Sequence, residues 1–314
     1  MRVLVTGGAG FVGSFVVEAL RDAGHRVAVV DTLKSGRAEF VPQGVPLYQL
    51  DVTSPALREV FEEERPEAVC HHAAQASVAV SVRDPLEDAR VNVLGTLNVL
   101  QCCVRYGVGR VLFASTGGAL YGDPDSLPVR EDDPPRPLSP YGVHKFCGEQ
   151  HLANYGRLYG IRWAALRYGN VYGPRQDPYG EAGVVAIFCA AMLEGRQPVI
   201  FGDGLHTRDY VYVEDAAHAT LLALEVGAEG VINVGTGVET STRRIFELVR
   251  NATGYRGEPH YGPPRPGDVR RICLDATRAE QVLGWRPGVS LEEGIARTVA
   301  WFRNRAGAGH RDVP

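Results

Sequence analysis

Proton-transfer chemistry is indicated by a tyrosine and a lysine four residues apart, Tyr141 and Lys145, in the stretch YGVHK. In a helix, positions i and i+4 share a face, so the phenol and the ammonium would point into the same site. A neighbouring cation favours the phenolate, and we therefore expect the pKa of Tyr141 to be lowered toward the working pH of a general base. Lys145 is one of only two lysines among 33 basic residues. Its compact ammonium suits a ribose hydroxyl better than a guanidinium would.

Two hydroxyls, on Ser115 and Thr116, are expected beside this pair. They follow an apolar run at residues 111–114 that predicts a buried strand, and a helix is predicted at 141–159 after a proline-rich loop. The helix would therefore begin near the end of that strand. We identify Tyr141, Lys145, Thr116 and Ser115 as the candidate catalytic residues.

The first residues of the chain predict a dinucleotide-binding loop. An apolar run at residues 3–5 predicts a strand, Gly7, Gly10 and Gly13 follow, and residues 11–23 have the pattern of an amphipathic helix. In this context Gly7 makes the turn, Gly10 lets the backbone approach the phosphates, and Gly13 lets helix and strand pack closely. The pyrophosphate would lie at the N-terminus of the helix.

The choice between NAD and NADP is expected to depend on Asp31. This residue ends the next predicted strand, at 27–30, where a carboxylate would bind the adenosine ribose hydroxyls. Its negative charge would repel a 2′-phosphate, and Thr32 and Leu33 do not offset it. Arg37, further into the loop, is the one residue that could. We expect NAD.

The composition is that of a globular protein. Of 314 residues, 45% are hydrophobic and 22% charged, and the net charge of −4 is spread along the chain. Neither a nucleic-acid nor a membrane partner is indicated, because there is no basic tract and no apolar run long enough to span a bilayer. The chain starts directly with a predicted strand, and a cytoplasmic location is expected.

The cysteines and the adjacent histidines do not predict a metal site. The six cysteines form no CxxC pair and are expected to be reduced and structural. His71 and His72 have no further ligands at a suitable spacing, so no metal is expected.

Strands and helices alternate through the first half of the chain. Further strands are predicted at 47–50, 68–71 and 163–166, with helices at 55–64 and 86–106. This order predicts an α/β fold, a Rossmann-like doubly wound parallel sheet with right-handed crossovers. We expect an NAD-binding domain at 1–168, with strands near 210–234 returning to the sheet. A smaller interleaved C-terminal substrate domain is expected at 169–209 and 235–303, followed by a flexible tail at 304–314.

The order of motifs along nearly the whole chain resembles the extended short-chain dehydrogenases/reductases, and within them the UDP-glucose (UDP-galactose) 4-epimerase family. The matching stretches are TGGAGFVG, HAAQ, STGGALYG, YGVHK, RYGNVYGPRQ, GDGLHTRDYV and RPGD. The resemblance implies an NAD-dependent isomerase that inverts C4 of a UDP-hexose through a 4-ketose. It also implies a homodimer, formed through the helices around 92–106 and 141–159.

The resemblance also implies roles for individual residues. Cofactor binding is implied for Gly7, Gly10, Phe11, Val12, Gly13, Asp31, Asp51, Val52, Ala73, Ala74, Gln75, Tyr141 and Lys145. Substrate binding is implied for Thr116, Asn170, Arg208, Arg265 and Asp268. Many family members have serine where this chain has Gly117, so we assign the hydrogen bond to the sugar O4 to Thr116, with Ser115 as the alternative. Gly117 and Gly118 are expected to leave room for the ketose to turn.

Other activities of the same family remain open at this stage. UDP-N-acetylhexosamine or UDP-uronate epimerases use the same parts, and Ile272 would either widen the pocket for an N-acetyl group or pack in the core. A 4,6-dehydratase or decarboxylase would need a carboxylate near Thr116, yet no acid occurs between Ser115 and Gly122. A non-enzymatic NAD sensor would be expected to lack the intact Tyr141 and Lys145 pair.

Overall fold

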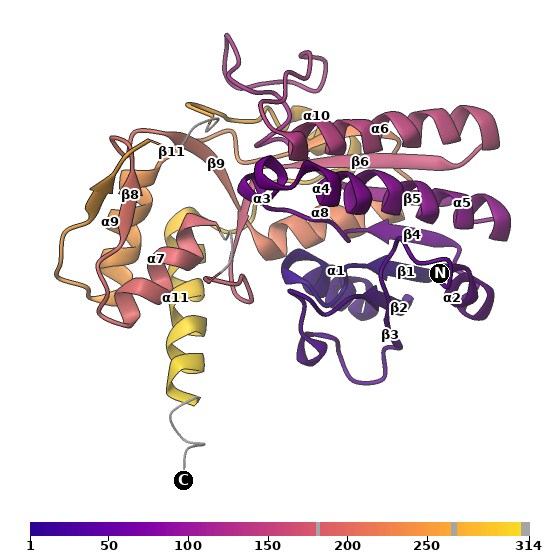
Figure 1. Cartoon of the computed structure of the whole chain (residues 1–314), viewed down its shortest axis with the longest axis horizontal. Helices are drawn as coiled ribbons and strands as arrows, with labels where there is room; N and C mark the ends of the chain where they lie inside the picture. Colours follow the sequence, from indigo (N-terminus) through magenta and orange to yellow (C-terminus); the bar gives the residue numbers. More distant parts are fainter. Residues whose placement is uncertain (180–182, 265–268, 309–314) are drawn as a thin grey trace.

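A seven-stranded sheet forms the larger part of the molecule. The structure, a computed structural model, describes residues 1–179, 183–264 and 269–308. The strand order is β10-β6-β5-β4-β1-β2-β3, and every neighbouring pair is parallel. The strands are β1 (Arg2–Thr6), β2 (Arg26–Asp31), β3 (Leu47–Gln49), β4 (Ala68–His71), β5 (Arg110–Thr116), β6 (Arg162–Tyr168) and β10 (Gly230–Val234). The predicted Rossmann-like parallel sheet is thus confirmed (Figure 1).

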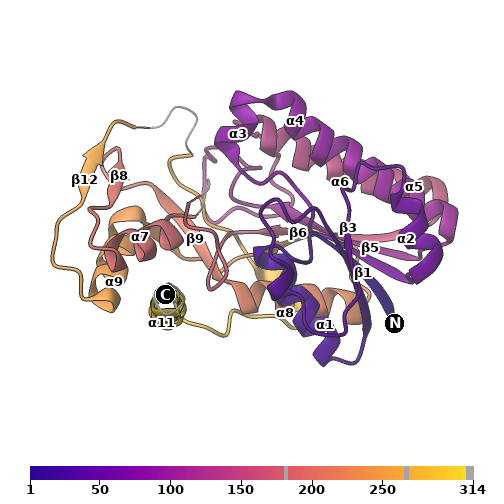
Figure 2. The ribbon, with the colours of Figure 1, turned by 60° about the horizontal axis from the view of Figure 1, so that its bottom comes forward.

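Helices cover both faces of this sheet, as Figure 2 shows from a second direction. They are α1 (Phe11–Asp22), α2 (Leu57–Glu64), α3 (Val78–Arg83), α4 (Pro85–Ala89), α5 (Thr96–Tyr106), α6 (Pro140–Tyr159), α8 (Val213–Glu225) and α10 (Thr277–Leu283), with a short 3-10 turn, η1 (Ala38–Phe40). The helix predicted at 86–106 contains a π-helical segment, η2 (Arg90–Gly95), between α4 and α5. None of the helices in the described part of the chain is long and apolar enough to cross a bilayer.

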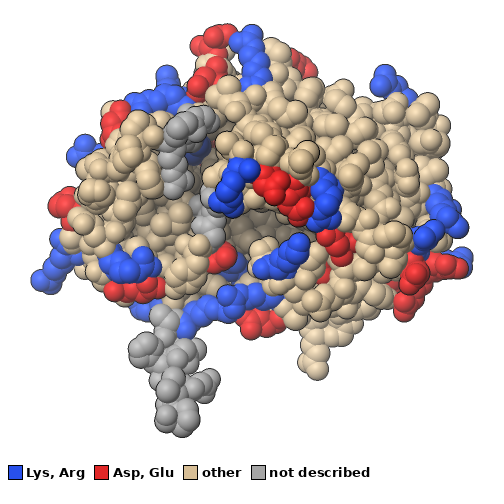
Figure 3. Space-filling view, viewed as in Figure 1, with Lys and Arg blue, Asp and Glu red and all other residues tan. Residues whose placement is uncertain are grey.

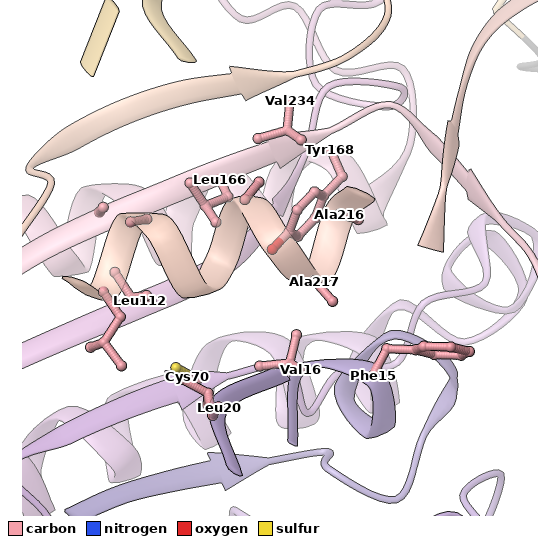
Figure 4. Packing of buried hydrophobic residues seen from close by; sticks show 14 of the residues in the cluster. Phe15, Val16, Leu20, Cys70, Leu112, Leu166, Tyr168, Ala216, Ala217 and Val234 are labelled. Carbon is pink, nitrogen blue, oxygen red and sulfur yellow. The ribbon is translucent and has the colours of Figure 1, made fainter. Parts of the chain in front are cut away.

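Side chains along each strand point alternately to the two faces of the main sheet, so the core has two layers, one on each face. Val3 and Val5 of β1 face one layer, which α1 and α8 cover with side chains such as Val16 and Ala216 (Figure 4). Leu4, between them, faces the other layer, which α2, α5 and α6 cover. Because successive side chains of a strand point to opposite faces, a near-continuous apolar run is what a strand buried on both sides requires.

The smaller part of the molecule has its own core and two small sheets. Strands β7 (Asn170–Tyr172), β9 (Thr207–Tyr212) and β11 (Glu239–Ser241) form one sheet, and β8 (Val199–Phe201) pairs with β12 (His260–Gly262) in the other. Helices α7 (Val184–Leu193), α9 (Thr242–Thr253) and α11 (Leu291–Ala308) pack around them. Of the two segments expected to return to the main sheet, only β10 does so.

The other segment, β9, pairs instead with β7 and β11, and its Asp209 is buried beside the chain that leads into β11. The Asp209 carboxylate accepts hydrogen bonds from the backbone N–H groups of Thr236 (2.8 Å), Gly237 (3.1 Å) and Leu274 (3.0 Å). At the other end of the chain, α11 continues to Ala308, so it includes the first residues of the segment predicted to be a tail.

The two parts are also joined around the ring of Phe40, in η1. The guanidinium of Arg175 lies 5.4 Å from this ring and that of Arg305, in α11, lies 5.7 Å from it. Arg175 also forms an ion pair with Glu18 of α1 (2.7 Å), and Arg305 forms one with Glu39 (2.7 Å). Cation–π contacts and ion pairs therefore hold the loop after β2 against the last helix.

Candidate functional site

The carboxyl ends of β1, β4 and β5 bring together the segments that were expected to hold a dinucleotide and a sugar. Parallel strands all end at the same edge of the sheet, which is where ligands bind in open α/β folds. In the space-filling view, the surface is hollowed between the two parts of the molecule and rimmed by charged side chains of both signs (Figure 3).

The glycine-rich loop after β1 is packed so tightly that side chains would not fit. Gly7 has φ +70°, and a Cβ there would lie 2.6 Å from the backbone nitrogen of Ala73. A Cβ on Gly13 would lie 2.1 Å from the carbonyl oxygen of Gly7. Helix α1 begins at Phe11, so the N–H groups of Phe11 and Val12 belong to its first turn, which has no intrahelical acceptors. The loop therefore has the shape of a cradle for an anion such as a pyrophosphate.

Asp31 is buried at the end of β2 and holds this cradle. One of its carboxylate oxygens accepts from the N–H of Ala9 (3.0 Å) and the other from the N–H of Leu33 (2.8 Å). Each oxygen has a second lone pair, which leaves capacity for a ribose hydroxyl. The role of Asp31 in binding ribose stays a prediction.

Asp51 follows β3 and is joined to the π-helical segment. It accepts from the hydroxyl of Thr53 (2.8 Å) and from Arg90 (3.1 Å), while Asn98 of α5 donates to the carbonyl of Val52 (2.7 Å). Burial alone would raise the pKa of Asp51, but these hydrogen bonds and the charge of Arg90 lower it below its usual value. Asp51 and Val52 are thus held together after β3, and their contact with an adenine stays a prediction.

The segment containing Ala73, Ala74 and Gln75 follows β4 directly. The N–H of Ala73 donates to the Thr6 hydroxyl (3.3 Å). Gln75 exchanges two hydrogen bonds with Asn92 of η2, from its N–H to the Asn92 Oδ1 (3.1 Å) and from the Asn92 Nδ2 to its carbonyl (2.9 Å). The segment thus runs beside the glycine cradle with its backbone fixed from both sides.

Tyr141 and Thr116 are brought together as the sequence predicts. Helix α6 begins at Pro140, capped by the Ser139 hydroxyl, and the Thr116 hydroxyl at the end of β5 lies close enough to the Tyr141 phenol to lower its pKa. The predicted lowering of the Tyr141 pKa is wrong for the chain by itself. Removal of the phenol from water and the charge of Asp88 raise it, and the Thr116 hydroxyl offsets only part of this effect.

Lys145 lies one turn further along α6 and is nearly completely buried. Its ammonium donates to the carbonyl of Ala114 (2.8 Å) and lies 4.6 Å from the centre of the Phe113 ring. Burial lowers the pKa of Lys145 to about 8, although Asp88 and Glu149 act to raise it. The lysine is therefore held at the end of β5 by contacts that are independent of Tyr141.

Ser115 points away from Thr116, toward a buried ion pair. Its hydroxyl donates to Glu149 (2.5 Å), which also accepts two hydrogen bonds from Arg167, at 2.9 and 2.7 Å. Arg167 in turn donates to the hydroxyl of Tyr121 (2.7 Å). These contacts favour Thr116 over Ser115 as the hydroxyl available to a substrate.

The candidate substrate residues are only partly within the described structure. Arg265 and Asp268 lie outside the described residues. Asn170 begins β7 and is the register partner of Tyr210 in β9, two residues beyond Arg208. The Asn170 Oδ1 is 3.0 Å from where a Cβ of Gly118 would be. Asn170, Gly118 and the end of β5 are thus adjacent.

The packing bears on two expectations about the size of the substrate pocket. It corrects the one for Gly117 and decides between the two alternatives for Ile272. A Cβ on Gly117 would lie 2.5 Å from a methyl group of Leu274, so the absent side chain at Gly117 makes room for the core and not for a sugar. Ile272 is only 1% exposed and packs with Leu120 and Val129 in a small apolar cluster. The sequence left open whether Ile272 widens the pocket or packs in the core, and the structure has it in the core.

His71, the last residue of β4, is held by neighbouring side chains. His71 contacts the Thr6 hydroxyl (2.6 Å) through Nδ1 and the Thr96 hydroxyl (3.0 Å) through Nε2. Burial and the charge of Lys145 lower the pKa values of His71 and His72 to about 3, so both rings are neutral. Among the described residues, no cluster of three His, Cys, Asp or Glu side chains is arranged to hold a metal ion.

The sequence did not single out Asp88, Asn92, Glu149 or Arg167, although all four are buried beside the candidate site. Glu149 is four residues after Lys145, a spacing that places both on one face of the helix and could have indicated it. Asp88 and Asn92 carry no comparable signal, because their partners His144 and Gln75 lie 56 and 17 positions away in the sequence.

The fold and the site define a dinucleotide-dependent enzyme of the short-chain dehydrogenase/reductase type. The chain belongs to the NAD dependent epimerase/dehydratase family, which it matches over residues 3–235.

Full-length relatives are epimerases. The chain is 48% identical to the UDP-glucose 4-epimerase of Mycolicibacterium smegmatis, over 98% of this chain and 100% of that one. It is 50% identical to a Thermotoga maritima UDP-glucose 4-epimerase solved with UDP-glucose (TM-score 0.95, covering 98% and 100% of the two chains). A Thermus thermophilus UDP-glucose 4-epimerase solved with NAD is also 50% identical (TM-score 0.92, covering 96% and 99%).

The glycine cradle predicts that Gly13→Ala prevents cofactor binding. The new methyl group would overlap the Gly7 carbonyl oxygen, at 2.1 Å, and would force the loop open. We expect purified Gly13→Ala protein to contain less than a tenth of the wild-type amount of NAD, measured by mass spectrometry of the denatured supernatant. Gly109→Ala is the matched control, since a Cβ there meets nothing within 4 Å. A wild-type NAD content in Gly13→Ala would contradict the assignment of the cradle.

Proposed function

We propose that this protein is a UDP-glucose 4-epimerase, which interconverts UDP-glucose and UDP-galactose by inverting C4 of the hexose, with NAD as its cofactor. The observation that carries the proposal is the placement of Tyr141 and Lys145 of α6 beside the end of β5, where Thr116 lies, at the same edge of the sheet as the tightly packed glycine loop. Relatives that share half of the residues over nearly the whole chain support the same activity.

In this proposal the chain supplies the proton transfers and the positioning. NAD, when bound, takes a hydride from C4 of the sugar and returns it to the opposite face. Tyr141 accepts the proton of the C4 hydroxyl and later returns it, and Thr116 donates a hydrogen bond that stabilises the ionised phenol. The Lys145 ammonium, fixed at the Ala114 carbonyl, is placed to bind a ribose hydroxyl and to favour the phenolate.

The remaining residues bind the two ligands. The glycine cradle and Asp31 would hold the pyrophosphate and adenosine ribose of NAD, and Asp51 and Val52 would flank its adenine. The segment from Ala73 to Gln75 would line the nicotinamide. Asn170, Arg208, Arg265 and Asp268 would hold the UDP moiety.

The loop after β5 supports a dehydratase or decarboxylase activity less well than an epimerase activity. A dehydratase or decarboxylase needs a carboxylate close to the sugar ring, and the segment from Ser115 to Gly122 contains none. Glu149, which accepts a hydrogen bond from Ser115, is paired with Arg167 in the interior and therefore does not face the sugar. An epimerase needs only the tyrosine, the hydroxyl and the cofactor.

Two further properties stay predictions. We propose a homodimer formed through η2, α5 and α6, because Leu94, Leu158 and Tyr159 expose 57%, 63% and 55% of their surfaces there. The second property that we propose is a cytoplasmic location.

We expect purified protein to convert UDP-glucose into UDP-galactose of identical mass, with no NAD added, until both sugars are present at equilibrium. The cofactor is reoxidised in each turnover, so none is consumed. Proton NMR of the anomeric signals follows the conversion, and mass spectrometry checks the product. A product lighter by water or carbon dioxide, or a need for NAD+ in amounts equal to product, would contradict the proposal.

Tyr141→Phe should reduce kcat by at least about 10³-fold, because the ring still packs but the proton acceptor is lost. NAD should remain bound, and the melting temperature should stay close to that of the wild type. Tyr106→Phe is a control, since this tyrosine lies at the far end of α5. A Tyr141→Phe variant with more than a tenth of wild-type kcat would remove Tyr141 from the proton-transfer role.

Thr116→Val should reduce kcat by about 10²-fold or less, the usual effect of losing one positioned hydrogen bond in a transition state. Ser115→Ala should have the smaller effect on kcat, because its hydroxyl bonds to Glu149 and not toward the cleft. Both rates are measured under saturating UDP-galactose. If Ser115→Ala is the more damaging change, the two hydroxyls have been assigned in the wrong order.

A further inference from the structure

Asp88, in α4, carries a carboxylate that is completely buried close to the candidate site. Its Oδ1 accepts hydrogen bonds from the Gln75 side chain (2.5 Å) and the Asn92 side chain (3.1 Å). Its Oδ2 accepts from the Nδ1 of His144. A buried carboxylate is costly unless its lone pairs are satisfied, and here three donors satisfy them.

The donors to Asp88 come from three segments that are separate in the sequence. Gln75 ends the segment proposed to line the nicotinamide, Asn92 is in the π-helical segment, and His144 lies on α6 between Tyr141 and Lys145. One carboxylate therefore ties the cofactor side of the site to the helix that carries the proton acceptor. Helices α3, α4 and η2 all pack on α6, so the link is continuous with the core.

The charge of Asp88 also acts on both functional groups of α6. It raises the pKa of Tyr141, after burial, and it opposes the lowering of the Lys145 pKa that burial causes. Three other titratable groups in the described part of the site are His71 and His72, which are neutral, and Glu149, which is paired with Arg167. His144 faces Asp88 directly and binds it.

We propose that Asp88 is a positioning residue for the epimerase reaction, which through His144 and Gln75 holds the catalytic helix against the nicotinamide-side segment. This inference rests on the proposed function. Asp88 touches neither ligand; it acts through the side chains it binds and through its negative charge at Tyr141. Burial is the larger cause of the raised Tyr141 pKa, and the charge of Asp88 adds to it, which raises the lower end of the pH range in which Tyr141 can accept a proton.

The decisive variant is Asp88→Asn, which keeps the shape and removes the charge. Loss of a nearby negative charge favours the phenolate, so the acid limb of the kcat–pH profile should move to lower pH by about 1 unit or more. The same shift should be seen without turnover in the NMR titration of tyrosine labelled with carbon-13 at Cζ, with the Tyr141 signal identified by its absence in Tyr141→Phe.

Asp215→Asn is the matched control for a purely structural effect. Asp215 is also buried and accepts from the N–H groups of Gly288 (3.0 Å) and Val289 (3.1 Å). Its loss should lower the melting temperature without moving the pH profile or the Tyr141 signal. If Asp88→Asn behaves in this same way while the wild type turns over UDP-glucose, the inference is overturned and the proposed function stands. A wild type without turnover would overturn both.

A second pair of variants tests the link itself, should Asp88→Asn fail to fold. His144→Gln keeps an N–H donor for Asp88 and should retain kcat within about threefold. His144→Leu leaves the buried carboxylate without that donor and should lower kcat by at least tenfold with little change in KM. His151→Leu, two turns along the same helix, is the control. Equal kcat values for His144→Leu and the wild type would show that the link does not position α6.

Discussion

The backbone of the glycine-rich loop touches the segment after β4 and the start of α1 with no space for a side chain at Gly7 or Gly13. This contact fixes how far β1 and β4 extend before the chain turns, and therefore where a pyrophosphate and a nicotinamide can lie. Asp31 completes the constraint by binding the N–H of Ala9 from the neighbouring strand. The cradle is thus built from backbone positions that only a few residue types can adopt.

The proton-transfer side of the site depends on the buried Glu149 and Arg167 pair. Removing one partner of such a pair costs about 3–5 kcal/mol, since the other charge is left in the interior. The pair joins α6 to β6, and Ser115 attaches the end of β5 to the same carboxylate. Because Lys145 lies one turn before Glu149, the register of α6 against the sheet is set by charges that do not take part in the reaction.

The sequence predicts the parts of the fold that depend on local pattern. The six strands of the first half, α6 and the Tyr141 and Thr116 pairing all follow from apolar runs, glycine spacing and helical periodicity. The sequence does not predict the position of β9. This position depends on pairing with β7 and β11, and on contacts of Asp209 with backbone groups at 236, 237 and 274, which lie far from it in the sequence.

The electrostatics of the site were predicted less well than its geometry. The pKa of Tyr141 is raised by burial and by Asp88, 53 positions earlier in the sequence, whereas the sequence led us to expect Lys145 to lower it. Similarly, the glycine at position 117 led us to expect open space for the sugar, whereas the Leu274 side chain fills that space in the structure. Both errors concern partners that only tertiary packing brings into contact.

The packing of Arg305 on Phe40 and Glu39 links the order of synthesis to the completion of the cofactor loop. Arg305 is made 266 residues after Glu39. At ordinary ribosome speeds of about 5–20 residues per second, this separation corresponds to a delay of roughly 10–50 s. The strands that carry the glycine cradle are made early, but the loop after β2 can make its contacts with α11 only once Arg305 has been made. The ion pair and the cation–π contact between Arg305 and this loop are therefore absent during the first part of synthesis and are available only to the longer chain.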